Sequence, residues 1–456
     1  MKRNILLLLS LLTSVHVISQ TDSIRIREIY TEALSHGKSY SNLYDLTNNI
    51  GGRLSGSPEA QKAVEWAFKA MKAAGADTVY LQECMVPHWI RGDKESGNVI
   101  STSVSENIEL TIDALGGSVG TPKDGITAGI IEVMGVEELE KLGKSNIEGK
   151  FVFFNKAMDP TLIETFDGYR GVYKQRTIGA SEAVKYGAVG VIVRSCTLLK
   201  DDHPHTGSVI YSDTANKIPA CAISIKGADW LSEHLKTNKA LKFNLKMNCK
   251  TLPDERSFNV VGEIKGSIQP AEYIVVGGHL DSWDTGKGAQ DDGAGVVQSI
   301  EVIRIYKALG LTPKRTIRAV AFMNEENGNR GGKKYAEMAK LKNEKHLAAI
   351  ESDNGGFTPR GFTTTATPEI KTKIKSWRPL FEPYGVYDFN HDGAGVDIRP
   401  LMETGTICFE LKPDSQRYFD YHHAATDTFE AVNQRELELG GAAIAALIWI
   451  ISEHGF

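Results

Sequence analysis

Tyr273-Ile-Val-Val-Gly-Gly-His279-Leu-Asp281 is a short apolar run that ends in two polar side chains, as expected of a buried strand leading to a site. From residue 256 onward, strand patterns alternate with helix patterns. Strands are expected at 258–264, 272–278, 315–323, 347–352 and 406–411, and helices at 293–309, 331–341, 367–383 and 433–453. This alternation predicts an α/β fold whose central sheet is mainly parallel and flanked by helices.

Potential metal ligands lie at the ends of these strands or in loops beside them. They are His279, Asp291, Glu326, Asp353 and His423. Ligands of an open α/β sheet collect outside the carboxyl ends of its strands, so we expect these side chains to converge. Two imidazoles with three carboxylates suit borderline-soft divalent ions, for which zinc is the first choice. The sequence therefore predicts two zinc ions per chain.

The carboxylates of Asp291, Asp281 and Glu325 are expected to have different roles at this site. Asp291 precedes a helix, whose N-terminus favours negative charge, and its carboxylate can bridge two cations. Asp281 follows His279 by two residues, so on a regular strand it shares a face with His279 and can fix the tautomer of its ring. On a strand, Glu325 and Glu326 point to opposite faces, which leaves Glu325 unligated as a general base.

These groups predict a hydrolase. Water between two zinc ions loses much of its proton affinity, Glu325 completes the proton transfer, and the hydroxide attacks a carbonyl that one metal polarises. No Ser-His-Asp pattern or Gly-x-Ser-x-Gly motif in the sequence competes for the nucleophile. The glycine-rich stretch 277–295 carries four aspartates and one lysine, which is the wrong charge for binding phosphate.

The N-terminus has the pattern of a removable export signal. A charged start, Met1-Lys2-Arg3, precedes an apolar run that is shorter than the ~20 residues needed to span a membrane. Small residues favour cleavage between Ser19 and Gln20, so residues 1–19 are expected to be removed and the protein secreted or periplasmic. Because no cysteine lies near this point, a lipid anchor is not indicated. The apolar run 442–451 is expected to be a core helix.

The composition limits the possible partners of the chain, and its turn-rich segments suggest the domain division. The formal charge is 52 minus 57, or -5, without a basic block, which argues against nucleic-acid and anionic-membrane partners. A turn-rich segment near residue 115 predicts an inserted β-rich domain over 115–251, between catalytic segments 20–114 and 252–456. His203 and His205 flank a proline there and are expected to be surface loop residues rather than ligands.

The cysteines do not form a disulfide framework. The chain has five, an odd number without a C-x-x-C pair: Cys84, Cys196, Cys221, Cys249 and Cys408. We expect buried free thiols, and one bridge among Cys196, Cys221 and Cys249 stays open as an alternative in an exported protein.

Several motifs together resemble the zinc aminopeptidase and glutamate carboxypeptidase superfamily. They are His279-Leu-Asp-Ser, Asp291-Asp-Gly, Glu325-Glu326, Glu351-Ser-Asp353, His423-x-x-x-Asp427-Thr, Gly52-Arg-Leu-Ser-Gly-Ser57 and Pro204-His-Thr-Gly207. The likeness covers nearly all of the mature chain. It implies a zinc peptidase fold, a protease-associated-like domain at 115–251 that acts as a lid or spacer without chemistry, and a homodimer.

The resemblance also implies roles for the site residues. Asp291 would bridge two zinc ions, one held by His279 and Asp353 and the other by Glu326 and His423, with Glu325 as the base. The spacing of four residues to Asp427 selects His423 rather than His422. The superfamily has a non-proline cis bond after its bridging aspartate, here Asp291-Asp292. Roles for Asn354, Asp397, Tyr418 and Tyr421 stay open.

The first functional hypothesis is an exopeptidase that acts on dipeptides or short peptides with free termini. Aminopeptidase, carboxypeptidase and dipeptidase behaviour remain alternatives within it. A second hypothesis keeps the fold but changes the reaction to glutaminyl cyclisation or to hydrolysis of a non-peptide amide. The third is an inactive receptor or adhesion module. Such modules lack ligands or the base, whereas this chain has all of them.

Overall fold

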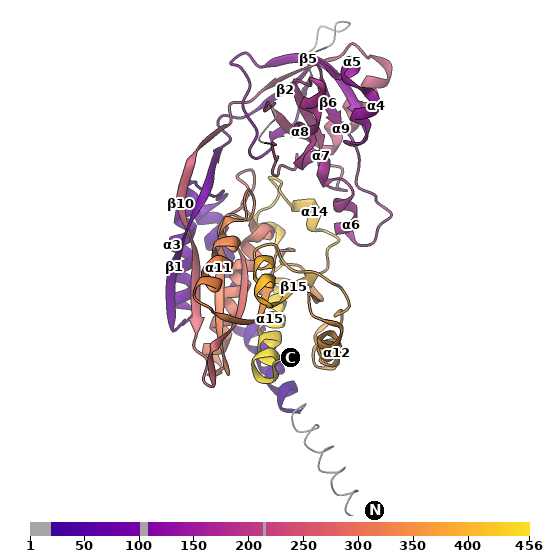
Figure 1. Cartoon of the computed structure of the whole chain (residues 1–456). Coiled ribbons are helices and arrows are strands. Elements are labelled where there is room, and N and C mark those ends of the chain that lie inside the picture. The colour runs from indigo at the N-terminus through magenta and orange to yellow at the C-terminus, as the bar shows by residue number, and fades with distance from the viewer. Residues whose placement is uncertain (1–19, 101–107, 213–215) are drawn as a thin grey trace, which may run out of the picture.

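The computed structural model describes residues 20–100, 108–212 and 216–456, which form two β-sheets with helices packed against them (Figure 1). The export signal expected over residues 1–19 lies outside the described residues. Residues 20–36 are helical.

The first sheet has seven strands and carries the expected α/β pattern. In spatial order these are β1 (Thr78–Ile90), β10 (Lys250–Ile264), β12 (Arg315–Phe322), β11 (Gln269–His279), β13 (Lys345–Glu351), β15 (Ile407–Pro413) and β14 (Pro359–Thr364). The four strands from β12 to β15 are parallel to one another, whereas β1, β10 and β14 pair antiparallel. The sheet is therefore mixed, and the expectation of a mainly parallel sheet holds only for its centre.

Helices cover both faces of this sheet, as expected. One face packs in a single apolar core against α3 (Pro58–Ala73), α10 (Ala294–Ala308), α12 (Pro368–Ser376), α13 (Arg378–Phe381) and α15 (Gln434–His454), beside α2 (Ser39–Tyr44). The other face packs against α11 (Arg330–Leu341) and the 3-10 turn Arg399–Thr404. Because helices cover both faces, residues 274–279 of β11 and 316–322 of β12 are buried.

Helix α15 is long and apolar enough to cross a membrane by length and composition. In the structure most of it is buried, and residues 442–448 are fully covered by the core. The Asn433 side chain caps its first turn by accepting a hydrogen bond from the Glu436 N–H at 3.1 Å. The prediction of a core helix over 442–451 is thus confirmed.

The second sheet has eight strands. Their spatial order is β3 (Ile108–Leu110), β2 (Ser96–Ile100), β9 (Lys242–Lys246), β5 (Ile126–Val133), β6 (Phe151–Phe154), β7 (Gly190–Arg194), β8 (Ala220–Ile223) and β4 (Ile112–Ala114). Short helices and one longer helix pack beside it: α4 (Glu138–Leu142), α5 (Lys144–Ile147), α6 (Thr165–Arg170), α7 (Tyr173–Thr177), α8 (Gly179–Ala183) and α9 (Ile225–Thr237).

Three strands of this second sheet precede residue 115, so the expected boundary at 115 lies inside the sheet rather than before it. Their alternating pattern was too short to separate from the preceding segment. The described residues between the end of β1 at Ile90 and the start of β10 at Lys250 carry the second sheet and its helices, and this segment is called the inserted domain. These two long strands pair antiparallel and run along one side of the molecule (Figure 1).

Arg91 fixes the inserted domain to the loop that follows β11. Its guanidinium donates to both carboxylate oxygens of Asp284 at 2.9 and 2.6 Å, and also to Glu95 and to the Ala114 carbonyl oxygen. Asp284 belongs to the loop between β11 and α10, which leads to Asp291. A bidentate arginine pair is among the stronger polar contacts in proteins, so this clamp sets the position of the inserted domain above that loop.

All five cysteines are buried and free. The expected buried thiols are confirmed, and the alternative bridge among Cys196, Cys221 and Cys249 is not formed.

Candidate metal centre

The five predicted ligands converge at the carboxyl ends of the parallel strands. His279 ends β11, Glu326 follows β12, and Asp353 follows β13. Asp291 lies in the turn before α10, and His423 follows the short helix α14 (Tyr418–Tyr421). Because the ends of adjacent parallel strands meet at one edge of the sheet, residues 144 positions apart in the chain (423 minus 279) share one site.

Asp291 lies between two separate pairs of side chains. Its Oδ1 atom is 3.0 Å from His279 Nε2, which in turn is 3.3 Å from Asp353 Oδ1. Its Oδ2 atom is 3.3 Å from His423 Nε2, which lies 3.1 Å from Glu326 Oε2. The two oxygens of one carboxylate thus face two clusters, each with one imidazole and one further carboxylate.

The donor set fits divalent cations. Asp291 Oδ2 and Glu326 Oε1 are buried and have no hydrogen-bond partner within the described part of the chain. Burial raises the pKa of Glu326 well above its usual value, and the Asp291 charge raises it further; burial likewise raises the pKa of Asp353, although His279 opposes this. Crowded buried carboxylates of this kind are stabilised by a cation.

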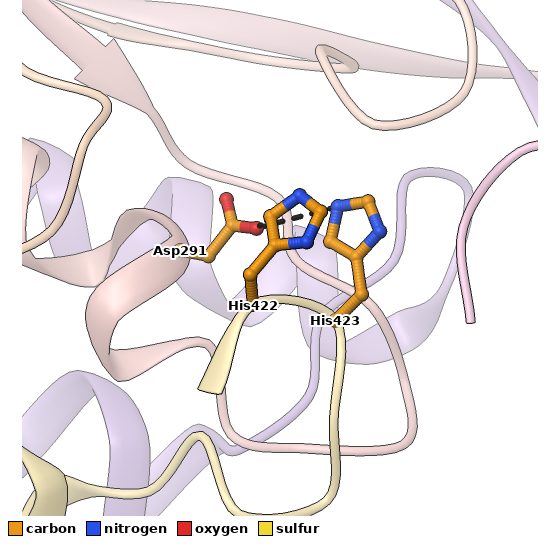
Figure 2. Close-up of side chains that lie close together, drawn as sticks. All are labelled: Asp291, His422 and His423. Carbon is orange, nitrogen blue, oxygen red and sulfur yellow. Dashed lines mark ion pairs between the residues drawn. The ribbon is translucent and has the colours of Figure 1, made fainter. Parts of the chain in front are cut away.

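His423 lies closer than His422 to the Asp291 carboxylate and pairs with Glu326, although both imidazoles belong to a group with Asp291 that could hold a metal ion. The two rings stack with centroids 3.6 Å apart and lie beside the Asp291 carboxylate (Figure 2). His422 Nε2 is 3.9 Å from Asp291 Oδ2, farther than His423, and none of its ion pairs reaches Glu326. Burial lowers the pKa of His422 to about 3 and that of His423 well below its usual value, which leaves both rings neutral, as metal binding requires.

Asp281 supports the site differently from the expectation. His279 Nδ1 lies 3.0 Å from the backbone carbonyl oxygen of Asp281, whereas the Asp281 carboxylate is 3.9 Å away. The backbone therefore fixes the His279 tautomer. The Asp281 Oδ1 atom instead accepts hydrogen bonds from the N–H groups of Asn324 at 2.7 Å and Glu325 at 3.1 Å. Its carboxylate holds the turn that carries the proposed base.

Glu325 and Glu326 lie in a turn rather than on a strand. β12 ends at Phe322, and Asn324 has a positive φ of 71°. The expectation that a strand directs the two side chains to opposite faces is therefore wrong. Glu325 nevertheless lines the cavity at the ligands. Burial raises the pKa of Glu325 to about 8; Asp353 and Asp291 raise it too, and His279 opposes them.

The backbone around Asp291 is held by two more aspartates. Asp427 accepts hydrogen bonds from the Gln290 N–H at 2.7 Å and the Asp291 N–H at 3.2 Å. Asp292 accepts hydrogen bonds from the His279 N–H at 3.0 Å and the Gly295 N–H at 2.8 Å, so both of its carboxylate oxygens bind backbone N–H groups. The Asp291-Asp292 bond is cis, as the resemblance implied.

Comparisons with known proteins agree with this arrangement. The family model described as peptidase family M28 matches residues 259–448. Carboxypeptidase Q of Mus musculus is 34% identical over 416 residues, covering 91% of this chain and 86% of the relative. The chain belongs to peptidase family M28. It is therefore a zinc metallopeptidase. The resemblance of its motifs to the zinc aminopeptidase and glutamate carboxypeptidase superfamily is confirmed. Within that superfamily the motifs point to carboxypeptidase Q, also called plasma glutamate carboxypeptidase.

Solved structures extend the comparison. An M28 peptidase precursor from Shewanella amazonensis SB2B has a TM-score of 0.90 and 32% identity, covering 95% of this chain and 97% of that one. A zinc aminopeptidase from Bacillus subtilis shares the fold with a TM-score of 0.63 at 21% identity, covering 90% of this chain and 94% of that one. The M28 fold thus extends over both sheets of this chain.

In this M28 chain the inserted domain, which was expected to be a lid or spacer without chemistry, contacts the metal centre through its backbone. His423 Nδ1 lies 3.2 Å from the Thr206 carbonyl oxygen, and the Thr206 N–H donates to the His423 carbonyl oxygen at 3.0 Å. His205 was expected on the surface but is buried, with its Nδ1 2.7 Å from the His422 carbonyl oxygen. The motif Pro204-His-Thr-Gly207 was the available sequence signal for this contact.

The M28 site also uses residues that the sequence reasoning missed. Arg176, on α7 of the inserted domain, is buried 3.4 Å from His423 Nδ1 and donates to the Tyr169 hydroxyl at 2.6 Å. Glu410, on β15, lines the same cavity of about 270 Å³. No local pattern identifies either residue, because Arg176 reaches the site from the inserted domain and Glu410 reaches it through the pairing of β15 with β13. Tyr418, whose role stayed open, also lines this cavity.

Proposed function

We propose that the chain is an exopeptidase with two zinc ions that hydrolyses dipeptides or short peptides with free termini. The observation that carries the proposal is the position of Asp291, whose two oxygens face one His-carboxylate pair each. Asp291 would be shared by both ions, His279 and Asp353 would hold one, and Glu326 and His423 would hold the other. Zinc would supply a Lewis acid for the scissile carbonyl and would acidify water.

Glu325 is the proposed general base. Its carboxylate lines the cavity beside the ligands but takes part in none of the close pairs around Asp291. It can accept a proton from the attacking water and deliver it to the leaving amine. Asp281 positions this base through the Glu325 N–H, so Asp281 acts on the turn rather than on the substrate.

The shape of the site supports a short substrate. The cavity at the ligands holds about 270 Å³, and an adjoining cavity beneath the inserted domain holds about 720 Å³. Volumes of this order suit small ligands. Because α6 and α7 of the inserted domain wall both cavities, a folded protein chain is a poor fit. The export pattern of residues 1–19 supports an enzyme that acts outside the cytoplasm.

Zinc counting together with a peptide panel tests this function. We expect two zinc ions per purified chain by plasma emission spectroscopy, and hydrolysis of free dipeptides. One zinc per chain with turnover of an N-terminal glutaminyl peptide to a cyclic product would favour the glutaminyl cyclase alternative. Two zinc ions without hydrolysis of any peptide would favour a non-peptide amide as the substrate.

A further inference from the structure

The cavity at the metal centre opens into the larger cavity under the inserted domain. The residues that line both are Phe166, Tyr169, Arg176, Asn354, Val396 and Glu410. If the scissile bond lies at the metal ligands, as the proposed function requires, part of the substrate must lie beside these shared residues. Glu410 is the carboxylate among them.

The strand β15 presents Glu410 to this junction. Phe409 and Leu411, its neighbours in sequence, are fully buried in the main core. Because successive side chains of a strand point to opposite faces, Glu410 is directed away from that core. It lies opposite Glu351 of β13 and Thr363 of β14 in the register of the sheet. The position is therefore fixed by pairing on both sides.

Glu410 has no cationic partner among the residues that the structure describes. Of the nearby cations, Arg176, which lines the same junction, donates to the Tyr169 hydroxyl at 2.6 Å. Arg170 pairs with Asp167, Lys412 pairs with Glu164 and Asp388, and Arg399 donates to the Ala394 carbonyl oxygen. Burial raises the pKa of Glu410 to about 7 and the Asp353 charge raises it too, while hydrogen bonding with the Asn354 side chain opposes them. A partly buried carboxylate without a counter-ion is costly, and an incoming cation would remove that cost.

We propose that Glu410 binds an ammonium group of the substrate and so selects peptides that carry one next to the scissile bond. The group could be the free α-ammonium of the peptide or the side-chain ammonium of a lysine, which share the same chemistry. This inference rests on the proposed function. It adds a residue that would set which end of a peptide the enzyme recognises.

The variant Glu410→Gln tests the inference with three compounds: Ala-Ala, Lys-Ala and propionyl-alanine, which is Ala-Ala without its amino group. The amide keeps the shape of the side chain and can still bond to Asn354. We expect the KM for Ala-Ala to rise about 10- to 100-fold, the usual effect of losing a charge-assisted hydrogen bond. The inhibition constant of propionyl-alanine should stay within about twofold, because it offers no cation to Glu410. A rise for Lys-Ala alone would identify the side-chain ammonium as the source.

Asp392→Asn is the matched control, because Asp392 lines the larger cavity but is exposed and paired with Lys371. We expect no change from it. The inference is overturned if Glu410→Gln leaves both dipeptides unaffected, if it weakens propionyl-alanine equally, or if Asp392→Asn has the same effect. Hydrolysis by the zinc-loaded wild-type enzyme tests the proposed function separately. If that fails, calorimetric dissociation constants of the same three compounds still decide the role of Glu410.

Discussion

His423 Nδ1 lies 3.2 Å from the carbonyl oxygen of Thr206, so a backbone group of the inserted domain orients a proposed ligand that lies in the turn after α14. Ligating imidazoles commonly use their second nitrogen in this way, and the contact fixes both the tautomer and the ring direction. Zinc binding and the seating of the inserted domain should therefore depend on each other. Gly207, the next residue, offers a direct test of this relationship.

Gly207→Ala should weaken zinc binding about 10- to 100-fold, which is the usual effect of disturbing a group that orients a metal ligand. Gly207 has a φ of 132°, and an added Cβ would lie 2.7 Å from His423 Nδ1 and 2.6 Å from Arg176 Cζ. Competition with a zinc chelator measures the affinity. Gly405→Ala is the control, since Gly405 also has a positive φ of 82° but open space around it. Equal zinc affinity in both variants would contradict this coupling.

Glu325→Gln should lower kcat by about 10²- to 10⁴-fold, because the amide cannot accept the proton from water. The zinc content and the KM should change little, since Glu325 is not among the proposed ligands. Metal analysis and steady-state kinetics on one dipeptide measure these quantities. Glu337→Gln, an exposed acid on α11, is the control and should behave as wild type. Retained turnover in Glu325→Gln would refute the role of Glu325.

Asp281→Asn tests whether the backbone or the side chain of Asp281 holds the His279 ring. Because the backbone carbonyl of Asp281 holds His279, the variant should keep its zinc affinity. Its kcat should fall about tenfold or more, since the carboxylate that accepts from Asn324 and Glu325 loses charge-assisted hydrogen bonds. A parallel zinc titration and kinetic assay check this. A large loss of zinc affinity would instead support the side chain as the partner of the His279 ring.

Glu438→Gln should stabilise the protein at high pH but not at low pH. Burial raises the pKa of Glu438 to about 7, and the neighbouring Glu301 adds to this. A carboxyl with a raised folded pKa stabilises the protein most below its unfolded pKa, and this contribution is lost as pH rises towards 7. The gain for the variant should therefore grow between pH 5 and pH 8, to at most about 3 kcal/mol.

Urea unfolding of the wild type and of Glu438→Gln at both pH values measures that difference. The carboxylates and histidines of the metal centre titrate in both proteins, so their effect cancels. Glu436→Gln, a partly exposed acid in the first turn of α15, is the control. A gain for Glu438→Gln that is independent of pH would show that charge at this position is not the cause.

Much of the catalytic half could be predicted from local patterns. The strand ending at His279 and the helix beginning after Gly293 follow from short-range periodicity, and that placed the five proposed ligands near one sheet edge. The same reasoning failed for Glu325 and Glu326, because a positive φ at Asn324 turns the chain before the strand pattern ends. It also missed β14 and the three strands before residue 115, which are too short for their pattern to identify them.

The sequence by itself determined which donor side chains are present and that apolar strands would carry them to one edge, because both depend on residue type and short-range spacing. Only the tertiary structure decided that Thr206 and Arg176 from the inserted domain lie beside His423, that the Asp281 backbone holds His279, and that Glu410 lines the junction of two cavities. The contacts of Thr206 and Arg176 join residues more than 200 positions apart, the place of Glu410 depends on the pairing of β15 with β13, and the Asp281 contact depends on how the chain turns after β11. A pattern of residue types does not encode these relationships.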